Sequence, residues 1–164
     1  MYGRQHPSKS DDHYILFMCG GIQYQDHKIY FPQPNARLPV KLRHGGITWI
    51  IWGRRKEEST GKFPNGGWAR LDSIKVGKWK PWHPRPVLIP AESFMEKDHD
   101  KQSHWISLAP GIAIQALLAE RDDERRGYVV TEETPPEYHW IHDRWPSLPI
   151  ILPKRILSSM VYVI

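Results

Sequence analysis

Residues 85–96 read RPVLIPAESFME, and this stretch carries the clearest structural pattern in the chain. Its apolar run at 87–89 is typical of a buried β-strand, and the Pro-Ala pair that follows predicts a turn. Two carboxylates, Glu92 and Glu96, come four residues apart directly after that turn. A carboxylate just past a core strand can be held rigidly, which suits general acid–base chemistry. The alternative is that both glutamates are polar caps at the surface.

Short apolar runs of the same kind recur along the chain and predict a protein of many strands. They lie at 14–18, 29–31, 47–52, 87–89, 105–108, 112–118, 128–131 and 148–152, and Gly- and Pro-rich clusters at 32–39, 61–67 and 81–86 separate them. Residues 111–119 fit a strand or a helix. A short helix can begin near Thr134, as N-cap, with Pro135 at its first position. The predicted fold class is α+β, a mainly β single domain.

Length and composition narrow the class of protein. The chain has 164 residues, which suits one domain, and its 15 Pro and 12 Gly argue against long helical bundles. Cys19 is the only cysteine, so an intramolecular disulfide and a multi-cysteine zinc site are excluded. With neither HExxH nor CxxC, we predict no metal and no cofactor. No apolar run reaches the roughly 18 to 20 residues of a membrane span, so a cytoplasmic location without membrane contact is expected.

The net charge of +5 is unevenly distributed. Residues 1–90 hold 15 Lys and Arg against 6 Asp and Glu, a net of +9, whereas residues 91–164 hold 8 against 12, a net of −4. The range 37–85 also contains five of the eight tryptophans. Cations interleaved with aromatic rings suit single-stranded nucleic acid, because cations neutralise phosphates and rings stack on unpaired bases. The alternative is a solvated basic face beside core tryptophans.

Three short motifs hold the residues that could carry chemistry. Residues 18–21 read Met-Cys-Gly-Gly, in which glycines leave the Cys19 thiol uncovered. Glu96 ends the second motif, and His142 opens the third, His-Asp-Arg-Trp-Pro at 142–146. A histidine can transfer a proton at neutral pH. Each motif also has a purely structural interpretation: a small buried thiol, a surface cap and a solvated turn.

Taken in this order, the motifs resemble the SOS response-associated peptidase family. Family members open with Met-Cys-Gly-Arg, matched at 18–21, and carry a Trp-Gly pair, matched at 52–53. Their Asn-Ala-Arg-x-Glu-Thr segment is matched by Trp-Ala-Arg-Leu-Asp-Ser at 68–73. Their Arg-Cys-Leu-x-Pro-Ala-x-Gly-Phe-Tyr-Glu-Trp segment is matched at 85–97, and their His-Asp-Arg-Met-Pro at 142–146. The resemblance spans about residues 18–152 and indicates a divergent, short, phage-related bacterial member.

The resemblance implies a fold and a set of roles. The fold would be twisted antiparallel and mixed sheets forming a partly open barrel with a few short helices. The partner would be single-stranded DNA carrying an abasic site, with no obligatory protein partner, and the protein would associate with the nucleoid when bound. An N-terminal cysteine would form a covalent thiazolidine crosslink with the abasic sugar. Catalytic roles would fall to Cys19, Glu96 and His142, and DNA-binding roles to Arg70, Arg144, Trp52, Trp68 and Gly20.

Three departures from the family pattern bear on these roles. Gly21 stands where the family has arginine, Trp68 where it has asparagine, and Lys97 where it has tryptophan. The missing asparagine bears on substrate positioning, because an indole can only stack or donate one hydrogen bond.

The crosslink requires Cys19 to be the first residue of the mature chain. Residues 1–13 are polar, and we interpret residues 1–17 as a flexible leader outside the mature active form, with the domain at 18–164. Three routes stay open: translation from Met18 with removal of that methionine, self-cleavage of the leader by the peptidase activity that the family name implies, or a copy unable to form the ring. Two other functions stay open as well: a non-catalytic binder of single strands, and a cysteine hydrolase using Cys19, His142 and Glu96.

Overall fold

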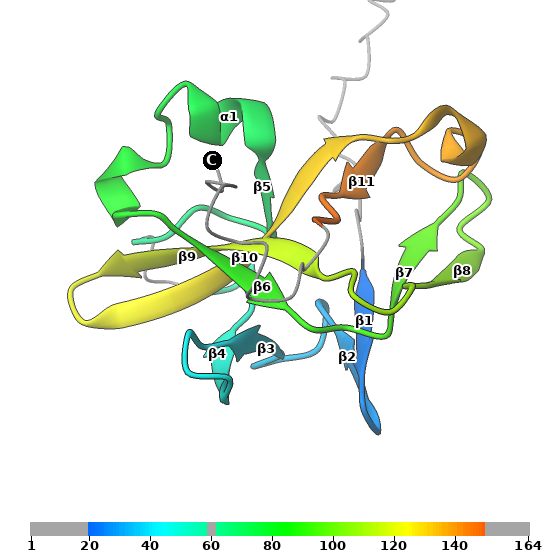
Figure 1. The fold of residues 1–164 in the computed structure, drawn as a ribbon. Helices are drawn as coiled ribbons and strands as arrows, with labels where there is room; N and C mark the ends of the chain where they lie inside the picture. The colour runs from blue at the N-terminus through cyan, green and yellow to red at the C-terminus, as the bar shows by residue number, and fades with distance from the viewer. Residues whose placement is uncertain (1–19, 59–61, 150–164) are drawn as a thin grey trace, which may run out of the picture.

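The computed structural model describes residues 20–58 and 62–149, which form a single, mainly β domain (Figure 1). Its strands are β1 (Gly21–Tyr24), β2 (His27–Tyr30), β3 (Arg37–Lys41), β4 (Ile47–Ile51), β5 (Trp68–Arg70), β6 (Arg85–Ile89), β7 (Ser93–Lys97), β8 (Ser103–Ser107), β9 (Ile114–Arg121), β10 (Glu124–Glu133) and β11 (Arg144–Pro146). Its helices are one turn of α-helix, α1 (Leu71–Lys75), and two 3-10 turns, η1 (Lys80–Trp82) and η2 (Pro136–Tyr138).

The strands form two sheets. The smaller sheet has the order β2-β1-β7-β8, and the larger has the order β11-β10-β9-β6-β3-β4, with β5 pairing in parallel with β10. Figure 1 shows the long β9–β10 hairpin running through the larger sheet, with β1, β7 and β8 to one side. The sheets are not closed into a barrel, and the likeness to the fold of the resembled family stays a prediction.

The main core forms because side chains along each strand point alternately to its two faces, and the apolar ones gather on the inner face. Ile22 of β1 pairs with Phe94 of β7, and both side chains are fully buried. They belong to one cluster with Trp52, Val129 and Trp145, which come from the larger sheet and its connections. A second cluster packs under α1 and η1 and includes Trp79, Tyr128 and Leu117. Most of the tryptophan-rich stretch therefore builds the interior.

Several predicted elements are confirmed, with shifted ends. Residues 29–31, 47–52, 87–89, 105–108 and 128–131 overlap β2, β4, β6, β8 and β10, and the ambiguous range 111–119 is a strand, β9. The short helix is the 3-10 turn η2, which begins one residue later than predicted: Pro135 rather than Thr134 is at the N-cap position, with no side-chain cap, and Pro136 is the first residue. The predicted strand 148–152 is wrong at residues 148 and 149, which are irregular. Its remainder, the predicted strand 14–18 and the predicted leader 1–17 lie outside the described residues.

The predicted runs miss five strands, β1, β3, β5, β7 and β11, and two of these show why. β3 contains Pro39, and prolines in that region suggest a connection. β3 pairs along its whole length with β4, but on its other side only Lys41 is paired, with Leu88 of β6. The proline is tolerated because no hydrogen bond to β6 needs the N–H that Pro39 lacks. β7 follows the Pro-Ala turn and contains a buried glutamate, which breaks the apolar pattern of a core strand.

Candidate functional site

Glu96 is the most deeply placed charged residue of the candidate site. It lies on β7, two residues after Phe94, so both side chains point into the space between the sheets. Its exposed fraction is 0%. β1 pairs with β7 in the register Gly21 to Met95, and the same register continued by one residue aligns Gly20 with Glu96. Glu96 therefore lies on the strand that pairs with the start of β1, close in the chain to Cys19, which itself lies outside the described residues.

His142 is buried on the segment between η2 and β11, with 6% of its surface exposed. The Arg144 backbone N–H donates a hydrogen bond to its Nδ1 over 3.0 Å, and the Asp143 carboxylate oxygen lies 3.2 Å from the same nitrogen. Burial lowers the pKa of His142 below its ordinary value, and the Asp143 carboxylate opposes that shift. The Arg144 carbonyl oxygen also lies 3.2 Å from Nδ1, so the backbone of Arg144 and the Asp143 carboxylate hold the ring at that nitrogen.

Packing between two elements brings the segments of Glu96 and His142 to one end of the molecule. Phe94 meets Trp145 edge to face at 5.0 Å, and His104 of β8 meets Trp140 in the same way at 5.0 Å. His99, in the β7–β8 turn, contributes electrostatically to the lowered pKa of His142. Figure 1 shows the η2–β11 segment beside β7 and β8. Two of the three predicted catalytic residues thus come from neighbouring segments.

Arg70 and Arg144 flank the end of β10. Arg70 of β5 is opposite Thr131 of β10, and Arg144 of β11 is opposite Glu133 of β10. Thr131 and Glu133 are two residues apart, so both arginines lie on one face of the sheet. Arg144 Nη2 donates to the Thr131 carbonyl over 2.8 Å, while Arg70 is exposed and forms two hydrogen bonds to Asp72. Burial and the nearby Arg70 lower the pKa of Arg144, and Arg70 holds the pKa of Asp72 at about 2. The two guanidinium groups therefore interact electrostatically, and one of them, Arg144, lies two residues beyond His142.

The two predicted stacking tryptophans differ in their surroundings. Trp52 is completely buried, and its indole N–H donates to the Gly67 carbonyl over 2.9 Å. Its ring has no face open to a base, so its assignment to DNA stacking is corrected to a core role. Trp68 is half-buried and packs against Phe31, with ring centroids 4.7 Å apart. Its indole nitrogen is buried and has no hydrogen-bond partner among the described residues. Only the partly exposed remainder of the Trp68 ring can contact a strand.

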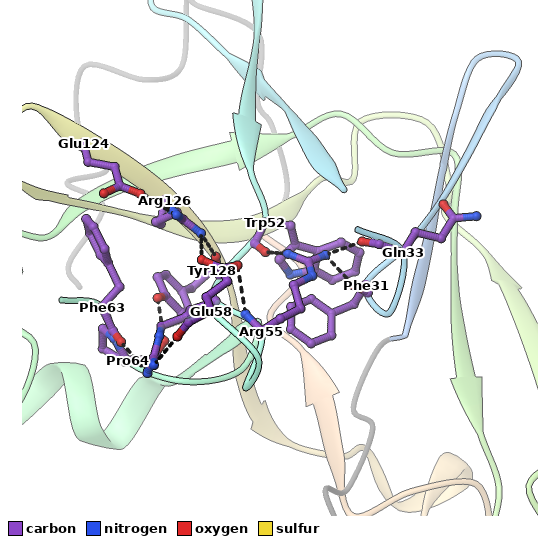
Figure 2. A network of polar contacts seen from close by, with 12 residues as sticks. Phe31, Gln33, Trp52, Arg55, Glu58, Phe63, Pro64, Glu124, Arg126 and Tyr128 are labelled. Atoms are coloured by element: carbon purple, nitrogen blue, oxygen red, sulfur yellow. Dashed lines mark hydrogen bonds and ion pairs between the residues drawn. The ribbon is translucent and has the colours of Figure 1, made fainter. Parts of the chain in front are cut away.

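Part of the basic stretch is used inside the protein, as Figure 2 shows. Arg55 donates to the backbone carbonyls of Trp52, Phe31 and Gln33, and its guanidinium lies 4.4 Å from the Phe31 ring centroid. Arg54 donates to the Glu58 carbonyl over 2.9 Å. These two cations fix the backbone before β5, so they do not belong to a phosphate-binding surface.

Thr131 is a site residue that sequence reasoning missed. It is fully buried on β10, between the strands that carry Arg70 and Arg144, and its hydroxyl lies 3.4 Å from Arg144 Nη2. No local signal marks it, because a threonine inside an apolar run is ordinary in a strand.

The described residues contain no group of three or more His, Cys, Asp and Glu side chains arranged to hold a metal ion. In the same part of the chain, no helix has the length and apolar character needed to span a membrane. Comparison of the sequence with protein-family models and with curated proteins found no match to either.

Proposed function

We propose that this protein binds single-stranded DNA and captures abasic sites covalently through Cys19 once that residue is N-terminal. The observation that carries the proposal is a fully buried carboxylate, Glu96, which follows Met95, the register partner of Gly21 at the start of β1. A second titratable group, His142, comes from the adjoining segment. A carboxylate and an imidazole beside an α-amine and a thiol form the set that imine and thiazolidine chemistry requires.

The proposed reaction is balanced without an oxidant or a metal. The abasic deoxyribose opens to an aldehyde, and the α-amine, with a pKa near 8, attacks it. Loss of one water gives an imine, and the thiol of the same residue adds across the C=N bond to close a five-membered thiazolidine. A lysine, with a pKa near 10.4, is far less available as a nucleophile at neutral pH and has no thiol to close the ring.

Each described site residue has a role in this scheme. His142, as imidazolium, protonates the sugar oxygen as the ring opens. Glu96 orients the amine and accepts its proton. Arg70 and Arg144 bind phosphates on either side of the lesion, and Trp68 stacks on a neighbouring base. The reaction takes place in the cytoplasm, on DNA of the nucleoid.

The test is adduct formation on a denaturing gel between a chain beginning at Cys19 and a single-stranded oligonucleotide with one abasic site. We expect a slow-migrating band that Cys19→Ala abolishes. Glu96→Gln should reduce the rate of its appearance at least tenfold, because it removes the buried base. Glu92→Gln is the matched control, since Glu92 lies four residues away, is exposed and accepts a hydrogen bond from Gln25 N–H. An adduct that survives Cys19→Ala, or equal loss in both glutamine variants, would contradict the proposal.

One observation favours a second function, a non-catalytic binder of single strands. Trp68 occupies the position of the family asparagine and packs against Phe31 among the core residues, so its bulk fills space that an amide would leave. In that case the protein binds undamaged single strands, Cys19→Ala leaves their affinity unchanged, and no adduct forms with abasic DNA.

A further inference from the structure

The outer face of the small sheet has an unusual composition. Side chains alternate between the two faces of a strand, so the registers of β1, β2, β7 and β8 define which residues share it. The outer face, as we call it here, consists of Gly21, Gln23, Lys28, Tyr30, Ser93, Met95, Lys97, Ser103, Trp105 and Ser107. These ten residues include two lysines and two large aromatic rings, and none of the ten is acidic.

Its aromatic rings come together over a glycine. Tyr30, Gly21, Met95 and Trp105 stand opposite one another on four successive strands. Although their strands are not adjacent, the Tyr30 and Trp105 rings meet edge to face, with centroids 6.1 Å apart. A Cβ atom at Gly21 would lie 3.2 Å from the Tyr30 ring and 3.4 Å from the Trp105 ring. The absence of a side chain therefore permits this arrangement.

The same face is hollowed and positively charged. A hollow of about 200 Å³ is lined by Gly20, Tyr30, Pro32, Met95, Lys97 and Ser103. This volume is smaller than the roughly 300 to 1,000 Å³ of sites that bind drug-sized ligands, so the hollow suits a single ring. The Lys28 ammonium lies 5.2 Å from the centroid of the Trp105 ring, which is 37% exposed. Base-stacking rings between lysines are the features of a surface for single-stranded nucleic acid.

We propose that the outer face is a second contact surface for single-stranded DNA, where Trp105 stacks on an unpaired base and Lys28 and Lys97 bind phosphates. The proposal rests on the proposed function in one respect: Gly20 lines the hollow and follows Cys19, so the bound nucleotides would flank the captured sugar. Because the ten residues of this face carry positive charge and no negative charge, they offer the complementarity that a polyanion requires.

The test measures binding of the full chain to a fluorescent, undamaged oligothymidylate by anisotropy. Trp105→Ala should weaken binding about tenfold, because it removes a stacking ring. Trp49→Ala is the matched control, since Trp49 is also 37% exposed but lies on β4 and contacts Tyr24 and His27, outside this face. Trp105→Phe, which keeps a stacking ring, should retain most of the affinity. Wild-type affinity in Trp105→Ala would overturn the proposal, as would equal weakening by Trp49→Ala.

The lysines are tested by the dependence of affinity on salt. Lys28→Gln with Lys97→Gln should make the slope of log affinity against log salt shallower by about 1.4, which is about 0.7 for each lost phosphate contact on a single strand. The matched control pairs Lys41→Gln with Lys80→Gln, two exposed lysines on β3 and η1. An unchanged slope in the first variant would overturn the role of these lysines.

Two further measurements sharpen the test. The first distinguishes base stacking on the outer face from attraction to charge alone, and the second distinguishes binding on that face from covalent capture. Polyphosphate carries charge but no bases, so its binding should be unaffected by Trp105→Ala; equal weakening would show that the ring does not recognise bases. Adduct formation with abasic DNA is measured in parallel. Normal adduct yield with no effect of Trp105→Ala on binding rejects the surface and keeps the proposed function. Lost binding in Trp105→Ala without any adduct in the wild type keeps the surface and rejects covalent capture.

Discussion

At the scale of single residues, the contact between His142 and Asp143 influences the fraction of His142 that is protonated and can act as an acid. Burial makes the imidazolium of His142 less stable than in water, and the adjacent carboxylate offsets part of that cost. Asp143 itself is exposed, so its charge can be removed without disturbing the core. The pair therefore allows the acid role of His142 to be tested without replacing the histidine.

Asp143→Asn should slow abasic-site capture in a pH-dependent way. The substitution removes a charge that raises the pKa of His142, so that pKa falls further below its ordinary value. At low pH the ring is protonated in both proteins and their rates converge, whereas at higher pH the variant holds a smaller imidazolium fraction and is slower. Single-turnover rates at pH 5.5 and 7.5 measure the ratio. Asp123→Asn, in the β9–β10 turn, is the control, and a ratio that stays constant with pH would contradict the acid role.

At the scale of elements, a buried arginine fixes the connection that leads into β5. Arg126 of β10 donates to the Gly53 carbonyl over 3.0 Å and to the Glu58 carboxylate over 2.9 Å, and it also pairs with Glu124 (Figure 2). Burial lowers its pKa, but the hydrogen bonds to Glu124 and Glu58 outweigh this and raise the pKa overall. Because β5 carries Trp68 and Arg70, this ion-pair network positions part of the candidate DNA surface.

Arg126→Met should lower the free energy of unfolding by about 2 to 3 kcal/mol. Removing one partner of a fully buried ion pair costs about 3 to 5 kcal/mol, and the partial exposure of Glu58 and Glu124 reduces this. Arg125→Met is the control, because Arg125 is the exposed neighbour and bonds only to Glu120 among the described residues. Urea denaturation measures both. A loss below about 0.5 kcal/mol in Arg126→Met would show that the network does not hold this connection.

The elements also show what the sequence could predict. Period-two and apolar runs indicate most strands, because burial on one or both faces leaves that pattern. The same patterns miss β3, where Pro39 suggests a loop, and β7, where Glu96 interrupts the apolar face. Motif order singles out Glu96 and His142, whose catalytic roles stay a prediction, whereas the prediction for Trp52 is wrong because a tryptophan in a basic stretch can equally be a core residue. Thr131 gains its position only through pairing with two other strands.

At the scale of the whole molecule, some of the basic side chains hold the fold together, and others are left at the surface where they can bind DNA. Arg54, Arg55 and Arg126 are used for backbone and carboxylate contacts inside, so the net charge of +5 overstates the cations free to meet DNA. The arginines at the end of β10 and the lysines of the outer face remain. The arginines lie beside the His142 segment, whereas the lysines lie on the outer face of the small sheet, where Gly20 lines the hollow.

The most direct measurement of the central claim is the intact mass of the covalent adduct. The natively expressed protein is incubated with a single-stranded oligonucleotide carrying one abasic site, and the product is weighed with and without borohydride. We predict a mass equal to a chain beginning at Cys19 plus the oligonucleotide minus one water, unchanged by borohydride because a thiazolidine has no C=N bond to reduce. No adduct, an adduct of a chain beginning at Met1, or an adduct that gains two hydrogens would contradict capture through an N-terminal Cys19.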